Sequence, residues 1–283
     1  MTASAAGMGA ELARSIHPEK VFGFLPGMSA ANLAALYGLD EPAYAALRNQ
    51  FAAETQAAAR ELLAEPGFAA AVDRLPFSAG QTVAVIGEST TDAAGCWLDI
   101  LGQLMLLQRP ADAIKLVNTA ISGYPTTMLQ RITSETLLRY RPGWIAFFGG
   151  GNDALRYGAG AAKPLVTGTE TAANLAEMRR QASAAGARMI WMTTTARDTA
   201  RIAAYQPFLA QQIWVEDEDL NAVDTAIRAM AGDGDALVDL SDAFGSPPDA
   251  ALLSADGLHP SLAGQKAIAR RFVARLARVQ GGR

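Results

Sequence analysis

Residues 81–92 read Gln-Thr-Val-Ala-Val-Ile-Gly-Glu-Ser-Thr-Thr-Asp, and this stretch decides the fold. Its first part, Thr82–Ile86, is a nearly continuous apolar run, typical of a strand that is covered on both faces. Gly87 ends the run, and the polar residues from Ser89 onward can begin a helix. A buried strand that turns directly into a helix predicts a parallel α/β sheet.

The same alternation continues to the end of the chain. Four further apolar runs of strand length follow, at Ala113–Val117, Trp144–Phe148, Met189–Thr193 and Ala236–Leu240. Helical segments lie between or after the runs, at Ala94–Leu107, Thr126–Tyr140, Thr169–Ala185, Asp217–Ala231 and Ser261–Arg278. Five strands joined by crossover helices predict a five-stranded parallel sheet with helices on both faces.

The first 78 residues follow another pattern. Two alanine-rich stretches, Ser29–Tyr37 and Glu41–Ala64, are predicted helices, and Ser29 and Asp40 can cap them. We therefore divide the chain into a helical N-terminal extension, 1–78, and an α/β domain, 79–283. The extension can serve only for packing, or it can form a lid, a part of the substrate pocket or a contact between copies of the chain.

Composition limits the classes of function. The chain has 283 residues, of which 50% are hydrophobic, enough for a sizeable core. A net charge of −4 gives no reason to expect a nucleic acid or an anionic membrane as partner. The single cysteine, Cys96, excludes an intramolecular disulfide and fits a reducing cytoplasm. Neither a signal peptide nor a membrane-spanning segment is expected.

Polar residues that can carry chemistry follow the predicted strands. Ser89 follows the first strand, Gly123 the second and Asn152 the third, while Asp256 and His259 follow the fifth. In an open α/β sheet, ligands bind beyond the carboxyl ends of the strands. We therefore expect these five residues to meet at one edge of the sheet.

Each of these signals also has an ordinary structural explanation. A serine at this place can cap a helix, a glycine can serve a turn, and a histidine near a helix start is often structural. The pair Asp256 and His259 is more informative, because three residues of separation let the carboxylate reach one imidazole nitrogen. The other nitrogen is then free to face a serine hydroxyl.

One competing pattern lies in the third loop. Gly149, Gly151 and Ala154 match a loose dinucleotide-binding motif, with Glu170 downstream. That motif normally follows the first strand of its unit, and this loop follows a third strand. The sequence therefore favours a site without a nucleotide cofactor, and no cluster of metal-ligating residues is expected.

The combination of residues predicts acyl transfer. Ser89 is the candidate nucleophile, His259 the base and Asp256 the residue that orients it. The backbone N–H groups of Ser89 and Gly123 and the Asn152 side chain are candidate donors for an oxyanion.

Four segments together resemble the SGNH (GDSL-like) family of serine hydrolases. They are Val85–Thr91, Asn118–Gly123, Gly150–Asp153 and Asp256–Pro260. The resemblance runs from about Gln81 to the C-terminus. It implies a flavodoxin-like three-layer αβα sandwich, a Ser89–His259–Asp256 triad and an oxyanion hole formed by Ser89, Gly123 and Asn152. One residue departs from the pattern, because Glu88 stands where the family usually has Asp.

The substrate is expected to be a small or medium acyl ester, such as an acetylated metabolite or sugar. The long segment Ala196–Trp214 should overhang the site, and it contains Arg197 and Tyr205. Tyr124 and Leu258 adjoin site residues and are further candidates for substrate binding. Two alternatives stay open: an acyltransferase that uses the same acyl-enzyme, and a non-catalytic binding module.

Overall fold

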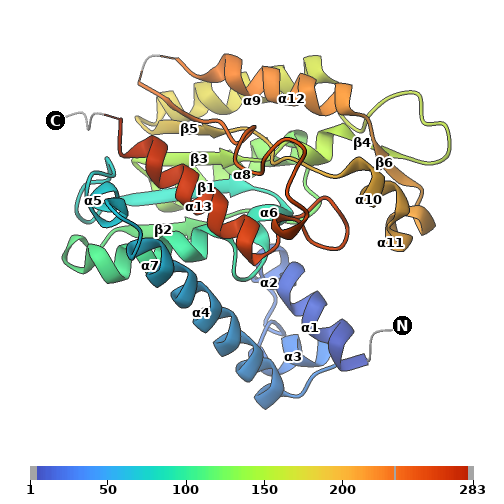
Figure 1. Ribbon diagram of the computed structural model, residues 1–283, viewed down its shortest axis with the longest axis horizontal. Coiled ribbons are helices and arrows are strands. Elements are labelled where there is room, and N and C mark those ends of the chain that lie inside the picture. Colours follow the sequence, from blue (N-terminus) through green and yellow to red (C-terminus); the bar gives the residue numbers. More distant parts are fainter. Residues whose placement is uncertain (1–4, 233, 280–283) are drawn as a thin grey trace.

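The computed structural model describes residues 5–232 and 234–279, and a five-stranded parallel sheet lies at its centre (Figure 1). The strands are β1 (Thr82–Gly87), β2 (Lys115–Asn118), β3 (Trp144–Phe148), β5 (Arg188–Met192) and β7 (Ala236–Val238). Their spatial order is β2-β1-β3-β5-β7. Counted along the sheet strands alone, this is the flavodoxin-like order 2-1-3-4-5. The predicted fold class is confirmed.

The register of the strands brings three loops together. Gly87, at the end of β1, pairs with Phe148, at the end of β3. On the other side of β1, Val85 pairs with Asn118, the last residue of β2. The segments that follow these three strands therefore leave the same edge of the sheet.

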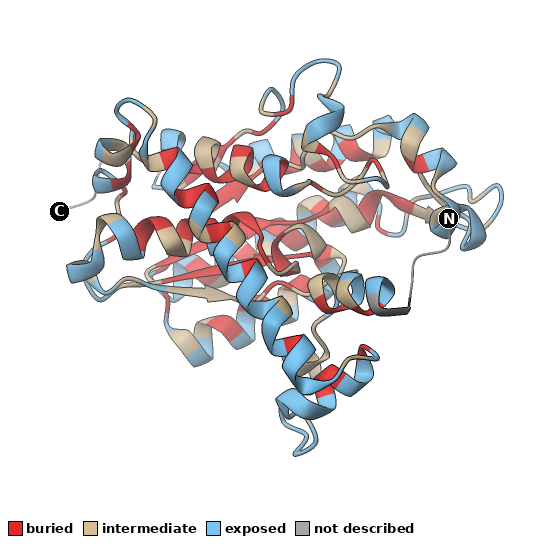
Figure 2. Ribbon diagram, turned by 60° about the horizontal axis from the view of Figure 1, so that its bottom comes forward, coloured by how far each residue is buried: buried red, intermediate tan, exposed pale blue. Residues whose placement is uncertain are grey.

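Helices cover both faces and complete three layers. One face carries α7 (Trp97–Gln108) and α13 (Leu262–Leu276) with parts of the N-terminal helices. The other carries α8 (Thr126–Tyr140), α9 (Gly168–Ala184) and α12 (Asp217–Met230). The strands between them are mostly buried (Figure 2), which explains their nearly continuous apolar runs.

Most differences from the predicted bounds are one to three residues long and have local causes. The second strand begins at Lys115 because Ala113 has a left-handed backbone, with φ of 47°. Helix α7 begins at Trp97 because Gly95, with φ of 82°, interrupts the predicted helix.

The N-terminal helices form two groups. Helices α1 (Ala5–Ser15), α2 (Pro18–Phe22), α3 (Ala30–Leu36) and the first part of α4 (Glu41–Leu63) project from the sheet layers (Figure 1). Helices α1, α3 and α4 share a small core that includes Leu33, Tyr37 and Tyr44. The end of α4 and helix α5 (Phe68–Asp73) instead pack into the main core. The main core thus continues across residue 78, and the division into two domains stays a prediction.

A small antiparallel sheet was not expected from the sequence. Strand β4 (Leu155–Tyr157) pairs with β6 (Ile213–Val215), although 55 residues lie between the end of one strand and the start of the other. Short helices α10 (Thr199–Ala204) and α11 (Gln206–Ala210) precede β6. Three-residue strands that pair over such a separation leave no local signal.

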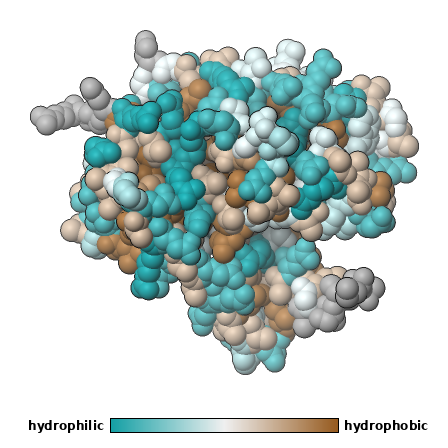
Figure 3. Space-filling model, viewed as in Figure 1, coloured by the Kyte–Doolittle hydropathy of each residue, from teal (hydrophilic) through white to brown (hydrophobic). Residues whose placement is uncertain are grey.

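The remaining short elements are α6 (Ser89–Asp92) and the 3-10 turns η1 (Pro110–Asp112), η2 (Gly151–Ala154) and η3 (Ala250–Leu252). In the part of the chain that the structure describes, no helix is long and apolar enough to cross a membrane. The face seen in Figure 3 is mixed, with hydrophilic residues among scattered hydrophobic ones.

Candidate active site

Ser89 stands at the start of helix α6, immediately beyond strand β1. Gly87 allows this turn to lie against β3, because a Cβ atom at residue 87 would stand 2.5 Å from the carbonyl oxygen of Phe148. Glu88 has an extended backbone and precedes the helix, so Ser89 is its first residue. The backbone N–H of Ser89 therefore lies at the positive end of a short helical turn.

His259 and Asp256 form a hydrogen-bonded row with Ser89. The imidazole Nε2 lies 2.8 Å from Ser89 Oγ, and Nδ1 lies 2.6 Å from Asp256 Oδ2. A carboxylate at Nδ1 favours the tautomer with its proton there, which leaves Nε2 free to accept the serine proton.

The loop that carries the pair is ordered by its own backbone. Asp256 Oδ1 accepts hydrogen bonds of 2.9 Å from the N–H groups of Leu258 and His259. Burial by itself would raise the pKa of Asp256, but its hydrogen bonds and the nearby imidazole outweigh this and hold the pKa below its ordinary value. The carboxylate thus stays ionised beside the histidine.

Two backbone N–H groups in the loops after β1 and β2 have no hydrogen-bond acceptor in the described part of the chain. The N–H groups of Ser89 and Gly123 donate to no other residue within the described ranges. Gly123 has φ of 79°, a backbone conformation that a residue with a side chain rarely adopts. Unpaired backbone N–H groups of this kind could serve as donors to an oxyanion.

Asn152 is held by Glu88. Its side-chain Nδ2 donates to Glu88 Oε2 at 2.8 Å and to the carbonyl oxygen of Tyr124 at 3.3 Å. Glu88 also accepts from the backbone N–H groups of Gly151 at 3.1 Å and Asn152 at 3.2 Å. Burial raises the pKa of Glu88 to about 7, although these N–H groups oppose the rise.

Gly151 makes room for the longer side chain at residue 88. A Cβ atom at residue 151 would stand only 2.6 Å from Glu88 Oε1. The glutamate that departs from the family pattern therefore fits the loop that carries Asn152. In this arrangement the Asn152 amide is already engaged, and an oxyanion would have to share it with Glu88 or Tyr124.

A small recess lies beside Ser89 and His259, and we call it the acyl recess. Its volume is about 40 Å³. It is lined by Glu88, Ser89, Thr90, Phe148, Gly149, Gly151, Asn152, Leu155, Thr194, Thr195, Arg197, Leu220, Leu258 and His259. The lining combines apolar walls with threonine hydroxyls and one guanidinium group.

The four candidate substrate-binding residues lie in different places. Arg197 and Leu258 line the acyl recess. The Tyr124 carbonyl oxygen accepts from Asn152, and its side chain packs against the core between the sheet and helices α8, α9 and α12. Tyr205 lines a separate surface hollow, where its ring stacks edge-on against Phe208 with centroids 5.0 Å apart.

The segment Ala196–Trp214 does more than border the recess. The Asp198 N–H donates to the carbonyl oxygen of Gly257 at 2.9 Å, and Arg201 Nη2 lies 2.5 Å from the carbonyl oxygen of Ser254. This segment thus supports the loop that carries Asp256 and His259. Nothing local in the sequence marks Asp198 or Arg201 as partners of a distant loop, so these contacts could not be predicted from it.

The glycine-rich third loop does not continue as a nucleotide-binding motif would. Gly151 begins the 3-10 turn η2, and strand β4 follows it. A dinucleotide motif needs a helix N-terminus at this point to receive the pyrophosphate. Among the described residues, no group of three or more His, Cys, Asp or Glu side chains is arranged to hold a metal ion.

A family model matches most of the α/β domain. Residues 85–267 match the model of the GDSL-like Lipase/Acylhydrolase family. No curated protein matches the chain in sequence.

Several solved structures share the fold at low sequence identity. LAE5, an alpha/beta hydrolase enzyme from the metagenome of Lake Arreo in Spain, is 21% identical with a TM-score of 0.56, over 71% of this chain and 97% of its own. TesA is 24% identical with a TM-score of 0.52, over 69% and 98%. A catalytic mutant of Axe2, an acetylxylan esterase from Geobacillus stearothermophilus, is 21% identical with a TM-score of 0.56, over 74% and 99%.

Proposed function

We propose, from the premise that this chain belongs to the GDSL-like lipase/acylhydrolase family, that it is a serine esterase acting on short acyl esters. Membership of the family makes the protein a carboxylic ester hydrolase. The proposal adds which residues carry out the reaction and which acyl groups fit. The observation that carries it is the hydrogen-bonded row Ser89–His259–Asp256.

The reaction begins at the Ser89 hydroxyl. His259 Nε2 takes its proton as Oγ forms a bond to the ester carbonyl carbon, and Asp256 stabilises the imidazolium. The N–H groups of Ser89 and Gly123 and the Asn152 amide donate to the oxyanion, each contributing about 3 kcal/mol. The bond from the carbonyl carbon to the alkoxy oxygen then breaks, and His259 gives its proton to the leaving alcohol, which leaves the acyl group on Ser89.

The second half of the reaction returns the enzyme to its starting state. A water molecule loses a proton to His259 and attacks the acyl carbon. The bond from that carbon to Ser89 Oγ breaks, the acid leaves, and the proton on His259 returns to Ser89.

The size of the acyl recess supports a short acyl group. A volume of about 40 Å³ next to Ser89 suits an acetyl group better than a long chain. Leu258 would border the methyl end, since it lines the recess beside His259. A similar fold in an acetylxylan esterase agrees with an acetyl ester as substrate.

Arg197 supports a polar group on the substrate. Its Nη2 pairs with Asp217 Oδ1 at 3.0 Å, and its side chain is 12% exposed. Its Nε is buried and has no hydrogen-bond partner within the described part of the chain. A buried, unpaired donor in a recess wall is costly unless a ligand oxygen accepts from it. We therefore propose that Arg197 binds an oxygen-rich or anionic part of the substrate.

The test begins with a fluorophosphonate probe, which labels an activated serine whatever the natural substrate is. Wild-type protein should be labelled, and Ser89→Ala should not. Ser241→Ala, which removes an exposed serine, should label like wild type. Labelling of Ser89→Ala at the wild-type rate would overturn the assignment of the nucleophile.

A panel of p-nitrophenyl esters from acetyl to octanoyl tests the acyl group. We expect kcat/KM to fall as the chain lengthens, and the opposite order would refute the short-acyl proposal. Product analysis with added alcohol separates hydrolysis from acyl transfer, because an acyltransferase would form a new ester instead of the free acid. The cytoplasmic location and a contact between copies through the N-terminal helices stay predictions.

A further inference from the structure

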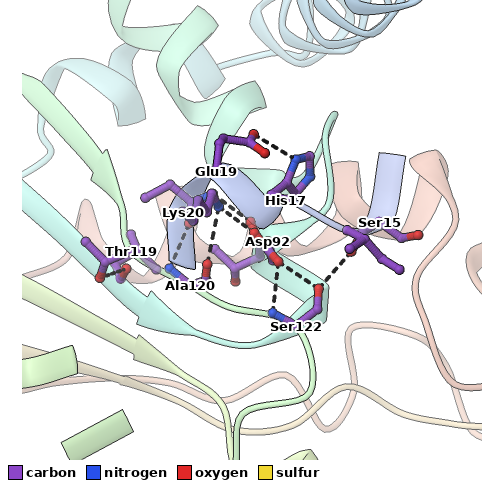
Figure 4. A network of polar contacts seen from close by, with 12 residues as sticks. Ser15, His17, Glu19, Lys20, Asp92, Thr119, Ala120 and Ser122 are labelled. Carbon is purple, nitrogen blue, oxygen red and sulfur yellow. Dashed lines mark hydrogen bonds and ion pairs between the residues drawn. The ribbon is translucent and has the colours of Figure 1, made fainter. Parts of the chain in front are cut away.

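The N-terminal extension contacts the two loops that lie behind Ser89. Residues 14–20, from the end of helix α1 into α2, run past helix α6 and the segment after β2 (Figure 4). The carbonyl oxygen of Arg14 accepts from Ala94 N–H at 2.7 Å, just beyond α6. The carbonyl oxygen of Ser15 lies 2.8 Å from Ser122 Oγ. Each of these contacts joins a residue of the N-terminal extension to a residue of the α/β domain.

Asp92 is the centre of this arrangement. It is the last residue of α6, the four-residue helix that begins with Ser89, and its side chain is 2% exposed. Its Oδ2 accepts from Ser122 N–H at 2.8 Å and lies 2.7 Å from Ser122 Oγ. One carboxylate therefore connects the nucleophile helix to the residue that precedes Gly123.

Lys20 supplies the charge that this carboxylate needs. Its Nζ lies 2.5 Å from Asp92 Oδ1 and donates to the carbonyl oxygen of Ala120 at 3.2 Å. Within the described ranges, Lys20 is the only cation paired with Asp92. A buried carboxylate that loses its partner is strongly destabilised where it stands. The position of Asp92, and of the groups it holds, therefore depends on a residue of the extension.

We propose that Lys20, through Asp92 and Ser122, is a positioning residue that holds the Gly123 N–H opposite Ser89, so that the extension sets part of the oxyanion hole. This inference rests on the proposed function, since it assigns a task to Gly123 and Ser89. It also gives residues 1–78 a role in catalysis, although they lie outside the segment matched by the family model.

The arrangement explains why a lysine suits this position. An ammonium group can donate to Asp92 and to the Ala120 carbonyl at the same time, and so joins α2 to both loops. Oxyanion donors act only when they are held in place before the reaction, and a misplacement of about 1 Å can lower the rate on the order of 100-fold.

Lys20→Met tests the proposal in the full-length protein. We expect kcat on p-nitrophenyl acetate to fall by about 10-fold to 100-fold with little change in KM. The rate of fluorophosphonate labelling should fall in parallel. Lys266→Met is the matched control, because Lys266 Nζ also pairs at 2.5 Å with a residue of the extension, Glu61, but far along α4. The control should keep kcat within about twofold.

A double variant separates positioning from stability. Lys20→Met/Asp92→Asn removes the unpaired charge while the Asn oxygen can still accept from Ser122 N–H. Its thermal midpoint should return towards the wild-type value, and its kcat should stay below wild type because the tie to α2 is lost. This variant also carries the test if Lys20→Met does not fold.

The outcomes are distinct. Wild-type kcat in folded Lys20→Met, or in the double variant, overturns the proposal. An equal loss in Lys20→Met and Lys266→Met does so too, because it would reflect general loosening of the extension. If wild-type protein is not labelled by the probe at all, the proposed function fails instead.

Discussion

The two sides of Ser89 are built in different ways. On the acid–base side, Asp256 and His259 lie three residues apart, and backbone N–H groups of the same turn hold the carboxylate. On the oxyanion side, Gly123 and Asn152 come from separate loops, and distant side chains such as Asp92 and Glu88 hold those loops. The proposed base is therefore held mostly by its own turn, whereas the proposed oxyanion donors depend on contacts between distant segments.

The largest effect is expected on the acid–base side. Asp256→Asn should lower kcat by about 10⁴, because an amide at Nδ1 favours the tautomer that can no longer accept the Ser89 proton. Steady-state kinetics on an acetyl ester measure it. Asp249→Asn is the control, since Asp249 caps the turn η3 in the same loop and should keep kcat near wild type. A loss below tenfold for Asp256→Asn would remove Asp256 from the triad.

On the oxyanion side, a single donor should matter less. Asn152→Ala should lower kcat on the order of 10²–10³ and leave KM for a short ester nearly unchanged. Since Glu88 and Tyr124 already engage the amide, the result also shows whether Asn152 serves the oxyanion or only Glu88. An unchanged kcat would mean that the hole consists of the Ser89 and Gly123 N–H groups.

Glu88, which holds Asn152, should make the free energy of unfolding depend on pH. Its pKa is raised from 4.5 to about 7, so between these values the folded protein binds a proton that the unfolded chain has released. The contribution of Glu88 to stability is therefore full below about pH 4.5 and is lost as the pH rises through 7. Across that interval the free energy of unfolding should fall by roughly 3 kcal/mol from this group.

Urea unfolding of wild type and Glu88→Gln at several pH values measures this term. The difference between the two unfolding free energies should change with pH in the stated direction, whatever its absolute size. Glu61→Gln, which alters an exposed side chain, should follow wild type. Parallel curves for wild type and Glu88→Gln would show that Glu88 does not titrate in this interval.

The smallest effect is expected at Tyr205, which supports neither side directly. Tyr205→Ala should change kcat/KM by less than about threefold and cost about 0.5–1.5 kcal/mol of stability through the lost contact with Phe208. Kinetics and thermal unfolding check both. A large rise in KM would instead indicate that Tyr205 contacts the substrate.

The five-stranded parallel sheet could be predicted from the sequence, because each strand carries its own apolar run, such as Thr82–Ile86. The sequence also predicts that Ser89, Gly123, Asn152 and His259 lie at one edge of the sheet, since residues that follow parallel strands meet there. The close pair Asp256 and His259 could be read from spacing alone, because a short turn allows few other arrangements.

The surroundings of those residues could not be predicted, because they consist of contacts between distant segments. Three contacts join segments that are far apart in the chain: the hydrogen bond from Asn152 to Glu88, the ion pair of Lys20 with Asp92, and the pairing of β4 with β6. No local pattern marks such partners, because each depends on how packed elements place two side chains within hydrogen-bond distance. The physical reason is that periodicity and turn residues act over a few positions, whereas long-range contacts follow from the completed packing.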